Sequence, residues 1–314
     1  MSTEIPAEAR LARIDTARQR YFSRMMRNPW YANVVIYTVL AFTVVITVVP
    51  ILNILVHSIS PVWVNDRYPL LLWPIEVTGE AYKYIFSTPT IMKAFGISVY
   101  RTCVGTLLNL ILTVSAAYGA TKYEVPGMKA FMIYVVFTML FGAGLVPFYI
   151  LIRMLGLMNS YLVYIMIGMV NAFNLILMRN FILNMPKELQ ESARIDGASE
   201  YQILLRIVVP LMKASIATIG LFYAIGHWND FWTPLLFITD QRRWSLPLLL
   251  RSIIYQNDMS GLGTIDIMLM RERVINPENI QAATIIFATV PIALVYPFLQ
   301  KHFTKGILIG AIKG

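Results

Sequence analysis

A few polar side chains lie inside long apolar segments of this sequence, where hydrogen-bonding groups are unusual. Asn171 and Asn174 are three residues apart in one segment, so a helix would place both amides on one face. His227, Asn229 and Asp230 lie in a second segment, in which His227 and Asp230 would share a face. A polar group removed from water costs free energy unless it finds a partner. These residues therefore predict either the lining of a path for a polar substrate or structural pairs within and between helices.

Catalytic and metal-binding patterns are absent from the sequence. No Lys is followed by Ser or Thr, so the chain holds no Gly-x-x-x-x-Gly-Lys-Ser/Thr phosphate loop. The patterns His-Glu-x-x-His, Cys-x-x-Cys and Gly-x-Ser-x-Gly are also missing, and the three histidines lie on separate segments. Cys103 is the one cysteine, so no intrachain disulfide can form. We therefore expect a protein that is not an enzyme and that binds no cofactor or metal itself.

The composition is that of a membrane protein. Apolar residues make up 57% of the chain and charged residues 14%, with a mean hydropathy of +0.63. A helix needs about 20 mainly apolar residues to cross about 30 Å of hydrocarbon. The segments that meet this requirement are 34–56, 95–117, 131–152, 161–178, 216–238 and 283–299. We therefore predict an all-α integral membrane protein with six transmembrane helices.

The positions of Lys and Arg indicate the orientation. Most of the 26 basic residues fall on one side if the chain starts in the cytoplasm, and the N- and C-termini then both lie there. The net charge of +9 thus indicates topology and contact with membrane lipid, not nucleic-acid binding. We expect residues 1–31 to form a basic cytoplasmic segment and 32–314 one membrane domain. The Arg-rich stretch 10–27 could alternatively lie as an amphipathic helix on the inner leaflet. Arg101, near the outer end of the second span, is expected to reach the lipid headgroups, and the alternative is that it faces the cavity.

A charged, helix-forming segment separates the fourth and fifth apolar stretches and lies in a predicted cytoplasmic loop at 186–213. Pro186 suits the first turn of a helix, and Gly197 supplies the freedom to turn before a second helix over about 198–208. The expected apolar face of the second helix comprises Tyr201, Leu204, Leu205 and Val208. Periodicity alone also fits an ordinary amphipathic loop that rests on the membrane.

The same loop resembles the EAA loop of ABC importer permeases, the inner membrane components of binding-protein-dependent transport systems. The resemblance includes Glu191, Gly197 and Pro210, whereas Ser192 replaces the usual first Ala. Asp196-Gly197-Ala198 and Trp228-Asn229-Asp230 are similar to the carbohydrate importers in particular. The resemblance extends from about residue 95 to the last residue, and 141–144 and 217–223 look most like the branch for polysaccharide and complex oligosaccharide uptake.

This resemblance implies a type I ABC importer permease fold in which transport and ATP hydrolysis belong to different chains. The loop would form a coupling helix on a cytoplasmic ATPase, and the residues carried over to this role are Glu191, Ala193, Arg194, Asp196, Gly197, Ala198, Tyr201, Ile207 and Pro210. The resemblance also implies a second permease subunit, two ATP-binding subunits and an extracytoplasmic solute-binding protein that delivers a carbohydrate. The chain would be half of a translocation pore in a bacterial plasma (inner) membrane.

Two other functions stay open at this point. An ion-coupled secondary carrier would use Asp230 or His227 as its coupling group and would leave the charged loop without a role. An ABC permease for a cargo other than sugar would share the loop and differ in its substrate. The outer segments 58–94 and 242–281 are long enough to contact a solute-binding protein, although a solvated loop explains their composition equally well.

Overall fold

The computed structural model describes residues 30–122, 124–258 and 277–311, and these residues form helices and loops without a strand. Nearly all of the basic N-terminal segment 1–31 and the charged patch Arg271-Glu272-Arg273 lie outside the described residues. The predicted all-α class is confirmed by the described part of the chain. The chain is therefore built as expected for a protein whose backbone groups must pair within helices in an apolar solvent.

Three of the predicted spans appear as long, apolar, continuous helices. They are α2 (Trp30–Ser58), α5 (Pro89–Gly119) and α17 (Pro277–Ala311). Each contains a stretch long and apolar enough to cross a membrane; in α17 it is Glu278–Val295. Pro89 stands in the first turn of α5, where its missing N–H costs no helical hydrogen bond. Hydropathy therefore located these three helices correctly.

The third predicted span, 131–152, is wrong as a single helix. The structure has α6 (Met128–Leu140) and α7 (Leu145–Met154), bent by 114° at the break between them. Gly144 in the break has a φ of +83°, a conformation that residues with a side chain rarely adopt. The glycines of 141–144 thus end one helix and start another inside an apolar stretch.

The fourth and fifth predicted spans are also interrupted. Residues 161–178 hold only the short α8 (Val163–Met166) and the first half of α9 (Ala172–Leu183). Residues 216–238 are divided between α13 (Lys213–Asn229) and α14 (Trp232–Phe237), because the helix stops at Asp230. The described residues include three helices able to span a membrane, or up to five if each bent helix pair counts as one span. The predicted number of six is therefore not confirmed.

Shorter helices complete the described structure. At the N-terminal side of α5 lie α3 (Val62–Arg67) and α4 (Glu80–Ser87). The predicted charged loop contains α10 (Glu188–Ile195), α11 (Glu200–Ile203), the π-helical turn η1 (Leu204–Val208) and α12 (Val209–Leu211). The 3-10 turn η2 (Gln241–Arg243) precedes α15 (Leu246–Asp258).

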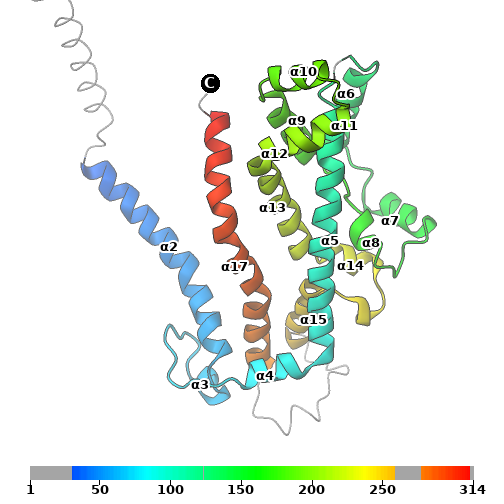
Figure 1. The fold of residues 1–314 in the computed structure, drawn as a ribbon. Helices are drawn as coiled ribbons and strands as arrows, with labels where there is room; N and C mark the ends of the chain where they lie inside the picture. The colour runs from blue at the N-terminus through cyan, green and yellow to red at the C-terminus, as the bar shows by residue number, and fades with distance from the viewer. Residues whose placement is uncertain (1–29, 123, 259–276, 312–314) are drawn as a thin grey trace, which may run out of the picture.

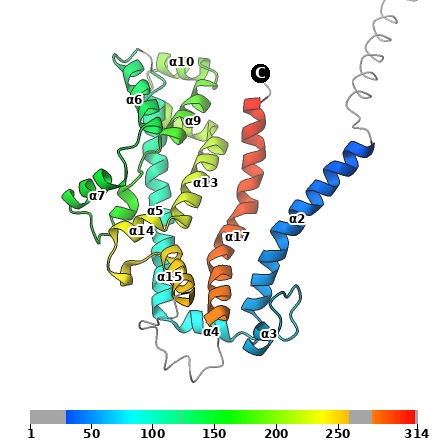
Figure 2. The same cartoon turned by 180° about the vertical axis from the view of Figure 1, so that it is seen from behind.

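Helix α5 is the central element, with α13, α9 and α15 packed against it, and α17 packs against α13, α15 and α2 (Figure 1). The approach of α13 to α5 is close, since a Cβ added at Gly105 would lie 2.6 Å from Nε2 of His227. Both views place the start of α2, the end of α17 and the charged loop at one end of the molecule, with α3 and α4 at the other (Figures 1 and 2). The start of α2 and the end of α17 thus lie on the same side of the molecule as the charged loop, and the cytoplasmic location of this side stays a prediction.

Candidate functional site

A polar cavity of about 250 Å³ lies beside α5, among side chains from α9, α13 and the break after α13. Its lining comprises Arg101, Asn109, Ile167, Gly168, Asn171, Asn174, Phe222, Tyr223, Gly226, His227, Asp230 and Thr233. Four of the five polar residues singled out in the sequence are therefore brought together. Asn229 is the exception, because it is exposed and does not line the cavity.

The strongest interaction in the cavity is an ion pair between Arg101 and Asp230. The Arg101 side chain is 4% exposed; one of its NH2 groups contacts the Asp230 carboxylate and the other donates to the Asp230 backbone oxygen at 2.9 Å. The guanidinium also lies over the ring of Tyr164, 5.0 Å from its centroid. The expectation that Arg101 reaches the headgroups is wrong, because Asp230 supplies a counter-charge inside the protein.

The ends of α13 and α14 explain how Asp230 reaches Arg101. Asp230 has extended backbone where α13 stops, and its Oδ1 accepts a hydrogen bond from the Thr233 backbone N–H at 3.0 Å. The predicted shared face of His227 and Asp230 is therefore wrong, since a continuous helix does not connect them. Asp230 pairs with Arg101, while His227 Nε2 lies 3.2 Å from Nδ2 of Asn109.

Hydrogen-bonding groups in the cavity remain without a partner among the described residues. They are Nε of Arg101 and Oδ1 of Asn109, whose residues are 4% and 1% exposed. An unpaired buried donor or acceptor costs roughly 1–3 kcal/mol, so such groups favour a bound polar molecule. The wall around them is held by Tyr223, whose hydroxyl lies 2.7 Å from Oγ1 of Thr113 and accepts from the Asn171 N–H at 3.1 Å.

The two predicted asparagines occupy the N-terminal end of α9. Asn171 is the residue before the helix, and its Oδ1 accepts a hydrogen bond from the Asn174 backbone N–H at 3.1 Å. The Asn174 side chain is buried and lines the cavity. The shared location was correctly predicted, but it arises from a helix start and not from one face of a continuous span.

The charged loop projects from the end of the molecule opposite α4 (Figure 1). Glu191, Arg194, Asp196, Gly197 and Tyr201 are exposed. Gly197 has a φ of +79°, and a Cβ there would meet no atom within 4 Å. The conformation of the backbone, and not packing, therefore requires a residue that tolerates positive φ between α10 and α11.

The inner side of the loop is anchored to the helices. Ala193, Ala198 and Ile207 pack against a buried cluster that includes residues of α5, α9 and α13, whereas Pro210 is exposed in α12. The predicted apolar face of the second loop helix is wrong in part, since Tyr201 is 70% exposed and Leu205 48%. Leu204 and Val208, which begin and end the π-helical turn η1, are buried as predicted, and Ile203 is buried beside them.

Glu200 at the start of α11 connects the loop to the end of α5. Its Oε1 accepts from Nε of Arg194 at 2.8 Å, and its Oε2 is 2.9 Å from Nζ of Lys122 and in contact with the Tyr118 hydroxyl. Partial burial raises the pKa of the Glu200 carboxyl, but the hydrogen bonds from Tyr118, Lys122 and Arg194 outweigh this effect and lower its pKa to about 2. No signal in the sequence identified Glu200.

Comparisons with known proteins place the chain among transport proteins. Residues 125–309 match the family described as "Binding-protein-dependent transport system inner membrane component". Protein LplC of Bacillus subtilis is 42% identical over 269 residues, which cover 86% of this chain and 90% of that protein. The polygalacturonan/rhamnogalacturonan transport system permease protein YtcP of Bacillus subtilis is 39% identical over 294 residues, covering 92% of this chain and all of the relative, 100%.

A solved structure has the same fold. It is a chain of a bacterial ABC transporter involved in the import of the acidic polysaccharide alginate, with 29% sequence identity and a TM-score of 0.82. The superposition covers 88% of this chain and 98% of that chain. The interrupted helices are therefore part of an ABC importer permease fold, and the predicted fold class is confirmed.

Replacing Asp230 with Asn should destabilise the protein strongly. The variant leaves the buried Arg101 charge without a counter-charge, which typically costs about 3–5 kcal/mol. The matched control is Asp240→Asn, at an exposed pair 3.7 Å from Arg243, where the cost should stay below about 1 kcal/mol. Thermal unfolding of the detergent-solubilised protein measures both. The double variant Arg101→Gln/Asp230→Asn should recover part of the loss; unfolding of Asp230→Asn at the wild-type temperature would contradict the role of the pair.

Replacing Glu200 with Gln should loosen the charged loop in a pH-dependent way. Because the folded pKa of about 2 is below the ordinary value of 4.5, the charge stabilises the loop above pH 4.5, and this contribution is lost as pH falls toward 2. The Glu200 side chain is 53% exposed, so we expect no more than about 1 kcal/mol. Hydrogen exchange of the loop amides, compared between wild type and variant at pH 7 and pH 3, measures the difference. Glu80→Gln is the control, and a difference independent of pH would contradict the prediction.

Proposed function

Since this chain belongs to the family of binding-protein-dependent transport system inner membrane components, we propose that it forms half of the pore of an ATP-driven carbohydrate importer. The observation that carries the proposal is the connection of an exposed loop and a polar cavity to one helix. Glu200 contacts Tyr118 at the loop end of α5, and Arg101 and Asn109 of the same helix line the cavity. A force applied to the loop is thereby transmitted to the cavity.

The proposed mechanism is a rigid-body movement. At 1.5 Å per residue, the distance along α5 from Tyr118 to Asn109 is about 14 Å and to Arg101 about 26 Å. A helix of this length transmits a displacement without bending greatly, because its backbone hydrogen bonds are made along its axis. Movement of the exposed loop by a partner ATPase would then shift the cavity wall and expose it to each side of the membrane in turn.

The residues proposed to contact the ATPase are those of the exposed loop surface. Glu191, Arg194, Asp196 and Tyr201 offer side chains to a partner, and Gly197 keeps the turn between α10 and α11. Ala193, Ala198, Ile207 and Pro210 have a different part, because they fix the loop on the helices or begin the following one. ATP is bound and hydrolysed by two partner subunits, since this chain has no phosphate-binding loop.

The proposed cargo is a carbohydrate, at the level of an oligo- or polysaccharide. Amide groups of Asn109, Asn171 and Asn174 line the cavity together with His227, and such groups both donate to and accept from hydroxyls. The polygalacturonan/rhamnogalacturonan permease and the alginate transporter are sugar transporters by name. These two lines of support agree on a ligand rich in hydroxyl groups.

The remaining parts of the system are proposed from the family and the arrangement of the helices. A second permease subunit completes the pore, and a solute-binding protein delivers the sugar at the end opposite the charged loop. The 186–213 loop and both termini then lie in the cytoplasm of a bacterium, with 1–31 as a basic segment and 32–314 as one membrane domain in the plasma membrane. An ion-coupled carrier is disfavoured, because the Asp230 carboxylate is held by Arg101 and Thr233.

Purification and transport together test this proposal. The tagged chain, extracted gently from its native membrane, should bring with it a second permease and an ATPase. Vesicles that contain the purified complex and the solute-binding protein should take up oligosaccharide when ATP is supplied. An active chain purified alone, with uptake driven by an ion gradient in the absence of ATP, would contradict the proposal.

Replacing Gly197 with Val should abolish coupling while the chain still inserts into the membrane. A β-branched residue is strained at a φ of +79°, whereas Asn tolerates this region, so Gly197→Asn is the matched control. We expect ATP-driven uptake to fall at least about tenfold for Gly197→Val and to stay above about half for Gly197→Asn. Normal uptake by the Val variant would show that this turn has no part in coupling.

Replacing Asn174 with Ala should weaken sugar uptake, while the ATPase should stay bound to the complex. The change removes a side-chain amide from the cavity. It keeps the backbone N–H of residue 174, which donates a hydrogen bond to Oδ1 of Asn171, so the start of α9 is preserved. Loss of one hydrogen bond to a neutral group predicts a decrease of about fivefold to tenfold at low sugar concentration. Asn180→Ala, at an exposed position of the same helix, is the control. Equal uptake by the two variants would exclude Asn174 from the substrate path.

A further inference from the structure

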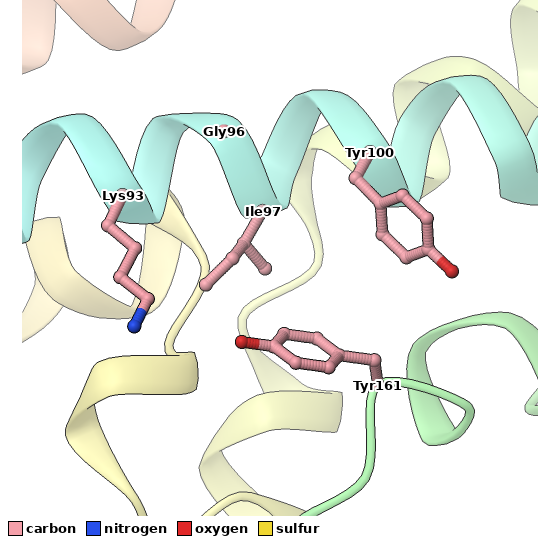
Figure 3. A pocket seen from close by; sticks show the side chains of 5 residues that line it. All are labelled: Lys93, Gly96, Ile97, Tyr100 and Tyr161. Carbon is pink, nitrogen blue, oxygen red and sulfur yellow. The ribbon is translucent and has the colours of Figure 1, made fainter.

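A second pocket, of about 470 Å³, lies on α5 near the end opposite the charged loop. Its lining comprises Lys93, Gly96, Ile97, Tyr100 and Tyr161 (Figure 3). The first four come from successive turns of α5, and Tyr161 comes from the segment between α7 and α8. No residue of this pocket is among the polar residues singled out in the sequence.

We propose that this pocket is an outer subsite for the carboxylate-bearing unit of an acidic sugar. The inference rests on the proposed function and specifies its substrate class. The side chains offer the two kinds of contact that such a ligand needs, a cation for the carboxylate and aromatic rings for the sugar ring. The following observations support each contact separately.

The cation is Lys93. In Figure 3 its ammonium group and the Tyr161 hydroxyl both point into the space below Ile97. No carboxylate among the described residues forms an ion pair with Lys93, so its charge is available to a ligand. A Lys side chain on an otherwise apolar helix face is costly in a membrane protein unless it serves a ligand or reaches the headgroups.

The aromatic surfaces are Tyr100 and Tyr161, which are 42% and 38% exposed. A phenol ring presents an apolar face to the C–H groups of a sugar and a hydroxyl to its oxygens. Arg243, which pairs with Asp240, lies over the Tyr161 ring, 5.6 Å from its centroid, and helps to hold that ring in place. At Gly96, on α5 between Lys93 and Ile97, a Cβ would meet no atom within 4 Å, so this part of the pocket wall is open (Figure 3).

The position of the pocket leads toward the polar cavity. Lys93, Ile97 and Arg101 follow one another at intervals of four residues, which places them along one side of α5. Arg101 lines the polar cavity about 12 Å further along the helix axis. Lys93, which has no paired carboxylate among the described residues, therefore favours acidic over neutral chains at this pocket. Arg101 is neutralised by Asp230 and offers the cavity only its Nε donor. Two similar proteins, named for polygalacturonan and for the acidic polysaccharide alginate, agree with this charge preference.

The test compares one oligosaccharide in two forms, a short oligogalacturonide and the same chain with its carboxylates reduced to alcohols. The complete complex in vesicles, with its solute-binding protein, is assayed for ATP-driven uptake of each form at low concentration. We expect Lys93→Gln to lower uptake of the acidic form about tenfold and that of the reduced form less than about twofold. Lys83→Gln is the matched control, an exposed Lys of α4 paired with Glu80.

Three results would overturn the inference. One is an equal decrease for both forms in Lys93→Gln, which would indicate contact with a lipid headgroup or a general effect on transport. Another is that the wild-type complex takes up the reduced form but not the acidic form. The third is uptake of neither form while another oligosaccharide is imported with ATP, in which case the proposed function would stand without this subsite. If the wild-type complex showed no ATP-driven uptake of any sugar, the proposed function itself would be contradicted.

Discussion

The buried ion pair between Arg101 and Asp230 is the interaction on which the arrangement of the helices depends. A guanidinium removed from water must find a counter-charge, and here that charge lies 129 residues along the chain. To supply it, α13 must stop at Asn229 so that Asp230 can face α5. The resulting break leaves room for a polar cavity, and the backbone groups that the break frees find partners, since the Thr233 N–H bonds the Asp230 carboxylate.

The sequence predicted the features that depend on composition and local chemistry. It located α2, α5, α17 and the charged loop with its turn at Gly197, because apolar length and glycine conformation are properties of a short segment. It also selected four residues of the cavity, since a polar side chain in an apolar stretch is itself the signal. The resemblance of the loop to ABC importer permeases agrees with the family match over residues 125–309.

What the sequence did not predict depends on contacts between distant segments. Hydropathy measures how apolar a stretch is and not whether its helix is continuous, so the breaks near Gly144 and Asp230 were missed. The partner of Arg101 could not be deduced, because an Arg near a helix end reaches headgroups or a buried acid equally well. The exposure of Tyr201 and Leu205 was missed for a related reason, since burial in this loop depends on packing against α5, α9 and α13.

Helix α5 is fixed to its neighbours at two positions along its length, and this restricts how the proposed importer can move. At the loop end, Tyr118 and Lys122 hold Glu200. About three turns from the other end of α5, Arg101 holds Asp230. The first contact is partly exposed and can rearrange with water, whereas separation of the second would leave two charges unpaired in an apolar interior. Helix α5 and the start of α14 therefore move together, and relative motion is confined to surfaces without such a pair. Under the proposed function, alternating access would require that this unit shift against the proposed second permease subunit, with the proposed substrate path along the side of α5 that carries Lys93 and Arg101.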